Sequence, residues 1–332
     1  MIDTIYIEEA LKDHPRTHAI IDRLHPTYII SIERYSEIFN RKKQNFRIQK
    51  RNPALILAQK NNRLVLPTPA GYGISTQKNY YFSHMLNCLY DCRYCFLQGM
   101  YSSAHYLLFV NFEDFTREIE MTIRQENEPV TFFSGYDCDS LALENVTHFA
   151  HEFLPLFARY PEHLFELRTK SINIKSLLQT KALKNVVVAF SLNPNAVINA
   201  LEHKAPSAEQ RLKAMLDLAN HGWPIGLRFD PLIDHIDYQE NYSTFFKQIE
   251  STIPEESIHS VSIGPVRFPV EMYAKIAQLY PQEKLFASGL KKTGQMVSYT
   301  QEREQELTFF ARTQLGRWIS DHKFFTCLPE AA

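Results

Sequence analysis

Short runs of aromatic and β-branched residues recur along the chain from about residue 79 onward, separated by longer polar segments. Such runs predict strands. They are NYYFSHML (79–86), PVTFFSG (129–135), LFELRTK (164–170), VVVAFSLN (186–193), PIGLRFDPL (224–232) and SVSIGPVRF (260–268). Segments between most of them carry apolar residues at helical spacing, as in 112–127 and in 207–222. The second of these helices is expected to begin at the N-cap Ser207 and to end at Gly222.

Strands that alternate with helices form parallel sheets, because each helix returns the chain to the same end of the sheet. Six such units are fewer than the eight of a closed barrel, which predicts an open, partial parallel (β/α)6 TIM-like barrel over residues 75–281. Residues 1–74 would form an N-terminal α/β extension, and residues 282–332 a mostly helical C-terminal extension. We also predict a helix over residues 139–157, with Asp139 as its N-cap.

Composition restricts the class of protein. The chain has 332 residues, 45% of them hydrophobic and 22% charged, which is ordinary for a globular protein. No apolar run approaches the ~20 residues of a membrane-spanning helix, and the first residues lack the pattern of a signal peptide. Five cysteines, an odd number, suggest reduced thiols. We therefore expect a cytoplasmic protein without a membrane partner. The formal net charge of −1 means that any nucleic-acid contact must come from a local patch.

Polar or metal-binding residues occur at every predicted strand end. The first strand leads to Cys88, Cys92 and Cys95. The residues at the other strand ends are Tyr136, Asp137, Cys138 and Asp139 after the second, Arg168 and Lys170 at the third, Ser191 and Asn193 at the fourth, Arg228 and Asp230 in the fifth, and Arg267 in the sixth. Active sites of parallel barrels lie where the strands end. The pattern therefore predicts one site at one mouth of the barrel.

The cysteine cluster NCLYDCRYCFLQ has three interpretations. Zinc needs four ligands, and His84, four residues before Cys88, could complete a Cys₃His site. Cys92 and Cys95 form a C-x-x-C pair, but a redox dithiol would leave Cys88 without a role. Three thiolates also suit a [4Fe-4S] cluster with one open iron. An open iron can chelate S-adenosylmethionine and deliver the electron that cleaves its C–S bond to a 5′-deoxyadenosyl radical.

The C-x₃-C-x-aromatic-C motif at the end of a first strand resembles the radical S-adenosylmethionine superfamily, and within it the spore photoproduct lyase family. The stretches that carry this second resemblance, over roughly residues 79–281, are CRYCFLQ, FVN, CDSLALENVTH, LRTKSINIKSLL, FSLNPNAVINALEHKAPSAEQRLKAMLDLANHGWPIGLRFDPLI and YQENYSTFFKQIE. The resemblance implies a barrel of the radical SAM type with a [4Fe-4S] cluster and S-adenosyl-L-methionine. It also implies a lyase that repairs damaged pyrimidines in DNA, supplied with electrons by a donor such as flavodoxin or ferredoxin.

The resemblance also implies roles for individual residues. The positions that match the cluster ligands are Cys88, Cys92 and Cys95. Tyr94 matches an aromatic residue near the adenine, although it also fits an ordinary core position. Asp139, Lys170 and Ser191 resemble positions that contact the amino group, the methionine carboxylate or the ribose of S-adenosylmethionine. An ammonium needs a carboxylate or hydroxyl partner, and a carboxylate needs a cation. The alternative interpretations are a helix N-cap, a surface lysine and a loop hydroxyl.

The chain departs from the family at the hydrogen donor. In the family a cysteine after the second strand donates a hydrogen atom to the product radical, and a tyrosine follows the third cluster cysteine. Aligned without gaps, the donor's place holds Tyr136, Cys138 lies two residues later, and Phe96 replaces the tyrosine. Residues two apart on an extended segment face the same side. We predict a catalytic role for Cys138 and, as the second candidate, for Tyr136; a buried thiol without chemistry is the alternative.

The segment RKKQNFRIQKR (41–51) carries six Lys or Arg residues and no acid, and includes Phe46. Such a cluster predicts phosphate contacts, although a solvated surface is the ordinary interpretation. Lys291 and Lys292, near Gly294, form a second basic loop where the family has a DNA-contacting hairpin, but the surrounding sequence differs. DNA is therefore the expected partner. Two alternatives stay open: a radical enzyme of this fold acting on a small molecule, RNA or protein, and a nucleic-acid-binding protein with a structural cluster. Cys327 is assigned no role.

Overall fold

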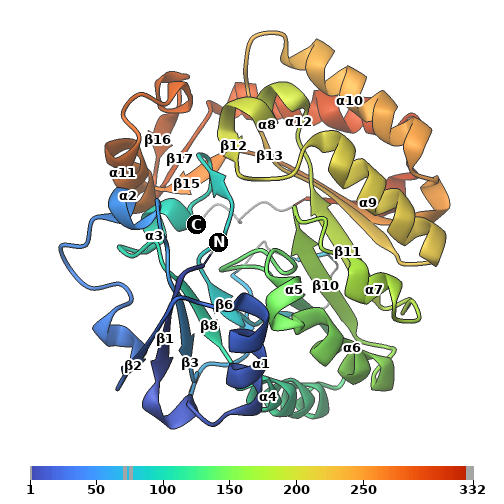
Figure 1. Cartoon of the computed structure of the whole chain (residues 1–332). Coiled ribbons are helices and arrows are strands. Elements are labelled where there is room, and N and C mark those ends of the chain that lie inside the picture. Colours follow the sequence, from blue (N-terminus) through green and yellow to red (C-terminus); the bar gives the residue numbers. More distant parts are fainter. Residues whose placement is uncertain (1, 70–72, 75–77, 327–332) are drawn as a thin grey trace.

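The computed structural model describes residues 2–69, 73–74 and 78–326, so Cys327 lies outside the described residues. Its main feature is a curled sheet with the strand order β18-β14-β13-β11-β10-β9-β5-β4 (Figure 1). The strands are β4 (Leu66–Pro67), β5 (Asn79–Tyr81), β9 (Thr131–Ser134), β10 (Leu164–Thr169), β11 (Val186–Ser191), β13 (Ile225–Leu232), β14 (Ile258–Pro265) and β18 (Phe324–Thr326). Neighbours from β5 to β18 run parallel, and β4 runs antiparallel to β5. The predicted partial parallel barrel is confirmed, and β18 adds a seventh parallel strand to the six that were predicted.

Helices cover the outer face of this sheet (Figure 1). They are α6 (Phe149–Arg159), α7 (Lys175–Leu178), α9 (Ala208–His221), α10 (Tyr238–Thr252) and α12 (Gln301–Leu315). The same half of the chain also forms α5 (Glu144–Thr147), α8 (Asn195–Leu201) and α11 (Val270–Leu279), and α11 packs against α3 (Leu97–Met100). The predicted ends of α9 are confirmed: Ser207 and Gln210 form a capping box, and Gly222 takes the left-handed conformation with φ 96°. Every residue of β11 is buried, as expected for a strand covered on both faces.

A second sheet has the order β2-β1-β3-β8-β6. Its strands are β1 (Thr4–Glu8), β2 (Tyr28–Ile32), β3 (Leu55–Ala58), β6 (Met85–Leu86) and β8 (Tyr106–Phe109), with α1 (Pro15–Leu24), α2 (Phe46–Gln49) and α4 (Phe112–Gln125) in the same part of the chain. The predicted single strand over 79–86 is therefore wrong, because the chain leaves the barrel sheet after Phe82 and joins the second sheet at Met85. The division of the chain at residues 74/75 and 281/282 stays a prediction.

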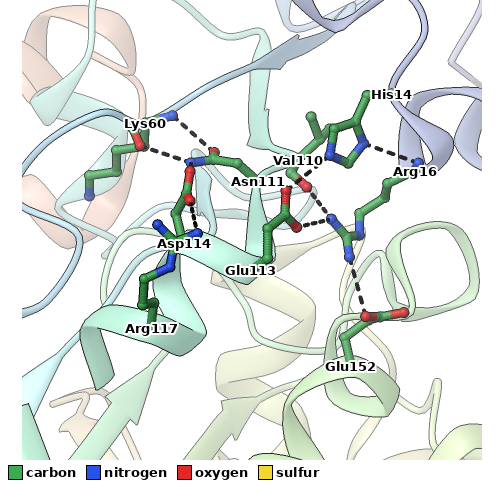
Figure 2. A network of polar contacts seen from close by, with 9 residues as sticks. All are labelled: His14, Arg16, Lys60, Val110, Asn111, Glu113, Asp114, Arg117 and Glu152. Atoms are coloured by element: carbon green, nitrogen blue, oxygen red, sulfur yellow. Dashed lines mark hydrogen bonds and ion pairs between the residues drawn. The ribbon is translucent and has the colours of Figure 1, made fainter. Parts of the chain in front are cut away.

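Arg16 ties the N-terminal helix to the helices of the barrel (Figure 2). Its guanidinium donates to the carbonyl of Val110, forms ion pairs with Glu113 at 3.1 Å and with Glu152 at 3.2 Å, and lies over the ring of Phe112. Because Glu113 lies on α4 and Glu152 on α6, one side chain of α1 joins three helices that are distant in the sequence. The N-terminal extension is thus a fixed part of the molecule.

One further expectation is corrected, and the C-terminal segment holds more elements than the predicted helix. The helix predicted over 139–157 is two helices, α5 and α6, separated by His148 in the left-handed conformation with φ 53°. The C-terminal segment contains α12, as predicted, but also β16 (Lys291–Thr293) and β17 (Met296–Ser298), which form a small sheet with β15 (Arg267–Pro269), and it supplies the edge strand β18. Among the residues that the structure describes, no helix combines the length and the apolar character needed to span a membrane.

Candidate active site at the carboxyl ends of the barrel strands

A cavity of about 300 Å³ opens where the parallel strands end. All of the predicted site residues line it, and they are Cys88, Cys92, Tyr94, Cys95, Tyr136, Cys138, Asp139, Lys170 and Ser191. Arg168, Asp230 and Arg267 line it as well. Arg228 does not belong to this lining; it is buried and pairs with Glu166 at 2.7 Å. The fold therefore brings residues from the whole predicted set of strand ends to one place.

The loop that carries the three cysteines is held from both sides. β7 (Asp91–Cys92) pairs antiparallel with β12 (Glu202–His203), and α3 (Leu97–Met100) begins two residues after Cys95. Asp91 forms ion pairs with Arg93 at 2.8 Å and with Lys50 at 3.7 Å. These contacts tie the loop to β12, to the basic segment 41–51 and to its own backbone turn.

The arrangement of the thiols suits a cluster better than a zinc ion. Within the described parts of the chain, no three His, Cys, Asp or Glu side chains converge to hold one metal ion. His84 stacks on Phe149 with ring centroids 3.7 Å apart, and it does not line the cavity with Cys88, Cys92 and Cys95. Zinc requires its ligands on a single atom, whereas a [4Fe-4S] cluster takes each thiolate on a separate iron.

Burial determines the charge of the thiols. It raises the pKa of Cys88 to about 12, raises that of Cys92 well above its ordinary value and also raises that of Cys95. Without a metal these thiols are neutral, and a coordinated metal deprotonates a thiol outright. Three buried thiols on one cavity wall therefore fit a resident iron–sulfur cluster, whose iron would deprotonate them on coordination.

Asp139 organises the end of β10 and does not cap a helix. Its Oδ1 accepts from the hydroxyl of Thr169 at 2.7 Å and from the backbone N–H of Leu141 at 3.0 Å. Its Oδ2 accepts from the backbone N–H of Lys170 at 2.6 Å. Burial raises the pKa of Asp139 in spite of these bonds. The N-cap interpretation is thus wrong, because this carboxylate bridges two loops at the cavity wall.

Lys170 places a cation in the cavity. Its Nζ lies 5.5 Å from the centre of the Tyr94 ring. Burial opposes the charge, but Cys92 in its thiolate form and the carboxylate of Glu202 outweigh burial and raise the pKa of Lys170. The cavity therefore offers a charged ammonium beside an aromatic ring.

The loop after β9 presents both candidate hydrogen donors. It turns at Gly135, where φ is 87° and an added Cβ would lie 2.7 Å from the hydroxyl of Ser140. The ring of Tyr136 packs against Tyr81 with centroids 4.6 Å apart. Cys138 is only 5% exposed, and its Sγ lies 4.0 Å from Nδ1 of His84. Both donors line the same cavity.

Sequence reasoning did not single out three residues near the site. Tyr90 lines the cavity beside Cys88. Glu202 and Arg211 form an ion pair with both side chains fully buried, next to the cysteine loop. The sequence signal for the Glu202–Arg211 pair was weak: Glu202 comes directly after the helical stretch that ends at Leu201, and this position by itself indicates no contact.

The model of the family described as "Spore photoproduct lyase" matches residues 67–315. This chain belongs to the spore photoproduct lyase family. The spore photoproduct lyase of Bacillus subtilis (strain 168) is 24% identical over 202 residues, which is 60% of this chain and 59% of that protein. The spore photoproduct lyase of Clostridium acetobutylicum is 23% identical over 209 residues, or 62% of each chain. The matches thus span about three fifths of the length of these relatives.

Solved structures of the spore photoproduct lyase family have the same fold. One is a spore photoproduct lyase mutant with bound AdoMet and dinucleoside spore photoproduct; it has a TM-score of 0.85, 17% identity, and covers 99% of this chain and 98% of its own. Another is spore photoproduct lyase complexed with dinucleoside spore photoproduct, with a TM-score of 0.82, 18% identity and the same coverage. The N-terminal sheet and the C-terminal strands therefore belong to the fold of the family and are not additions to it.

Proposed function

We propose that this protein is a radical S-adenosylmethionine lyase that repairs damaged pyrimidines in DNA. The observation that carries the proposal is the placement of three buried cysteines, Lys170 and Ser191 around one cavity at the carboxyl ends of the barrel strands. Family membership supports it, as does the binding of AdoMet and dinucleoside spore photoproduct by a structural relative. A [4Fe-4S] cluster and S-adenosyl-L-methionine are the proposed cofactors.

Different residues would bind the cluster and the methionine part of S-adenosylmethionine. Cys88, Cys92 and Cys95 hold the cluster, which when bound supplies the electron for cleavage of S-adenosylmethionine to a 5′-deoxyadenosyl radical. The ammonium of Lys170 suits the methionine carboxylate, because a charge-assisted hydrogen bond to a carboxylate is strong.

The other proposed cofactor contacts come from three different elements. Asp139 suits the amino group, Ser191 suits the ribose, and the ring of Tyr94 offers a face for the adenine. These side chains come from different strands and loops and line one cavity, which supports a shared role in binding one cofactor.

The rest of the cavity suits a nucleotide base. Tyr81, Phe96, Tyr136 and Phe325 line it with aromatic surface, and Arg267 adds a cation that pairs with Glu304 at 2.9 Å. A base that leaves the stack of its duplex can be bound between such rings, and damaged steps are the least costly to open. We assign DNA as the macromolecular partner, a small electron-transfer protein such as flavodoxin or ferredoxin as the reductant, and a cytoplasmic location.

The proposal is tested with the reconstituted holoprotein. Anaerobically reconstituted wild type should bind about four iron and four sulfide per chain. Reduced holoprotein incubated with S-adenosylmethionine and ultraviolet-irradiated DNA should form 5′-deoxyadenosine and restore thymine, both measured by mass spectrometry. Alanine at Cys88, Cys92 or Cys95 should abolish cluster binding, whereas Cys138→Ala is the matched control and should retain it.

The outcomes separate the alternatives. Stoichiometric zinc, with no iron–sulfur absorbance after reconstitution, would overturn the cluster assignment. Formation of 5′-deoxyadenosine with no change in any DNA photoproduct would overturn the substrate and favour a small-molecule, RNA or protein substrate. A stable cluster with no cleavage of S-adenosylmethionine would favour a structural cluster in a nucleic-acid-binding protein.

A further inference from the structure

One buried carboxylate lies between the two walls of the proposed cofactor cavity. Glu202 stands on β12 and is in register with Cys92 on β7, so its backbone is already paired with the cysteine loop. The backbone N–H of Arg93 also donates to the carbonyl of Leu201 at 2.8 Å. The segment that carries Glu202 is therefore the structural support of the loop that carries the cysteines.

The side chain of Glu202 reaches both walls. Its Oε1 accepts from the hydroxyl of Tyr94 and, at 3.0 Å, from the amide of Asn193. Its Oε2 accepts from Arg211, which in turn donates through Nη1 to the backbone carbonyl of Ser191 at 3.0 Å. Tyr94 belongs to the cysteine loop, whereas Ser191 ends β11 and Asn193 comes two residues later. A single carboxylate thus joins the two walls through named hydrogen bonds.

The charges in this network are matched. Burial alone would favour the neutral acid, but Lys170 and Arg211 outweigh burial and lower the pKa of Glu202. Among the described residues, neither Glu202 nor Arg211 lines the cavity. Replacing a buried ion pair by apolar residues is often neutral for stability, so stability alone gives no reason for a carboxylate at this place.

We infer that Glu202 is a positioning residue, which fixes the Tyr94 ring and the end of β11 at the spacing that the nucleoside part of S-adenosylmethionine requires. The inference rests on the proposed function, since it assigns that cavity to S-adenosylmethionine. The hydrogen bond from the Tyr94 hydroxyl to Glu202 prevents the Tyr94 ring from tilting. The hydrogen bonds that Glu202 accepts from Asn193 and Arg211 keep the end of β11 in place. A preformed slot binds more tightly than one that must be ordered by its ligand.

The test uses Tyr94→Phe and Glu202→Gln in reconstituted holoprotein. Tyr94→Phe keeps the ring and the Glu202–Arg211 pair and removes only the hydroxyl that Glu202 accepts. The matched control is Tyr238→Phe, because the Tyr238 hydroxyl also donates to a carboxylate, that of Glu306 at 2.9 Å, but lies on α10 outside the cavity. The measurements are iron content, the Kd of S-adenosylmethionine, its effect on the electron paramagnetic resonance spectrum of the reduced cluster, and the thermal midpoint.

We expect the iron content to be retained in every variant. The Kd of S-adenosylmethionine should rise by roughly three- to tenfold in Tyr94→Phe and by about tenfold or more in Glu202→Gln, because the ligand must then order a ring and a strand end that the wild type holds in place. The spectral effect of S-adenosylmethionine on the cluster should weaken in parallel. Tyr238→Phe should lower only the thermal midpoint.

Three results would overturn the inference. An unchanged Kd of S-adenosylmethionine and an unchanged cluster spectrum in Tyr94→Phe would overturn the inference, even if Glu202→Gln fails to fold. Loss of iron from Tyr94→Phe would assign the network to folding of the cysteine loop instead. A wild type that holds its cluster but binds no S-adenosylmethionine would overturn the proposed function, and this inference with it; wild-type binding together with normal variants would overturn the inference alone.

Discussion

Burial keeps the thiol of Cys138 in the form that can donate a hydrogen atom. It raises the pKa of Cys138 well above that of a free cysteine, and a donor of a hydrogen atom must carry its S–H bond. Tyr136 lines the same cavity, but its ring is packed against Tyr81 and Phe96. The protonated thiol of Cys138 and the packed phenol of Tyr136 are therefore the two candidates for the hydrogen-atom donor.

The comparison of Cys138→Ala with Tyr136→Phe decides between them. If Cys138 quenches the product radical, its alanine variant should continue to form 5′-deoxyadenosine but should lose most of the restored thymine and accumulate side products. Tyr136→Phe, which keeps the ring contacts, should restore thymine at close to the wild-type level. Both are measured by mass spectrometry of irradiated DNA after reaction. Clean repair by the cysteine variant would contradict the assignment.

Residue chemistry predicted the lining of the cavity but not its support. Cysteines, lysines and hydroxyls at strand ends can be selected from the sequence alone, because ionisable and polar groups in the mouth of a barrel often serve a function. Glu202 and Arg211 could not be found in this way. Glu202 contacts Tyr94, which is 108 residues away in the sequence, and Arg211 contacts Ser191, which is 20 residues away. Only the folded chain brings these residues together.

At the scale of elements, apolar runs predicted strands but not the sheet to which each strand belongs. The run over 79–86 was read as one strand because its pattern is continuous, yet β5 and β6 lie in different sheets. The run YLLF of β8 is apolar at every position, and its pattern alone does not reveal that it pairs with β3. Pairing depends on long-range contacts, which local periodicity does not contain.

The basic segment 41–51 borders the cysteine loop. Lys50, just after α2, forms an ion pair with Asp91 at 3.7 Å. Arg41, Lys42 and Lys43 are exposed, whereas Phe46 is buried and offers no surface for a base. Lys50 thus lies beside the cysteine loop, Arg41, Lys42 and Lys43 are exposed cations of the same segment, and Phe46 belongs to the core.

Neutralising Arg41, Lys42 and Lys43 together should weaken DNA binding mainly at low salt. If each contacts a phosphate, the slope of log K against log salt should become shallower by up to about 2.7, at about 0.9 per contact. The measurement is fluorescence anisotropy with duplex DNA at several salt concentrations. A matched triple change of exposed cations on the outer helices, at Arg117, Lys213 and Lys247, should leave the slope unchanged. Equal slopes for the wild type and the first variant would exclude the segment from the DNA interface.

At the scale of the whole molecule, the two sheets share one hydrophobic core. Residues of β1, β3 and β8 belong to the same buried cluster as those of β9, β10 and β11. His84 lies where the chain passes between the sheets, and its carbonyl accepts from the backbone N–H of Phe109 at 2.9 Å. Its ring is buried against Phe149. The stability of the joined sheets therefore depends on a titratable side chain at their junction.

Burial lowers the pKa of His84 from its ordinary value of 6.5 to about 3. In the unfolded chain His84 takes up a proton near pH 6.5, whereas in the folded chain it stays neutral, so stability is lost as the pH falls from 6.5 toward 3. The slope approaches about 1.4 kcal/mol per pH unit, which gives about 2 kcal/mol between pH 6.5 and pH 5. Thermal unfolding of wild type and His84→Gln between pH 5 and pH 7.5 measures this. The variant should be less stable at pH 7.5, because it loses the stacking on Phe149, yet its stability should fall less steeply in acid. The other histidines titrate equally in both proteins, so parallel curves would show that His84 does not carry the acid sensitivity.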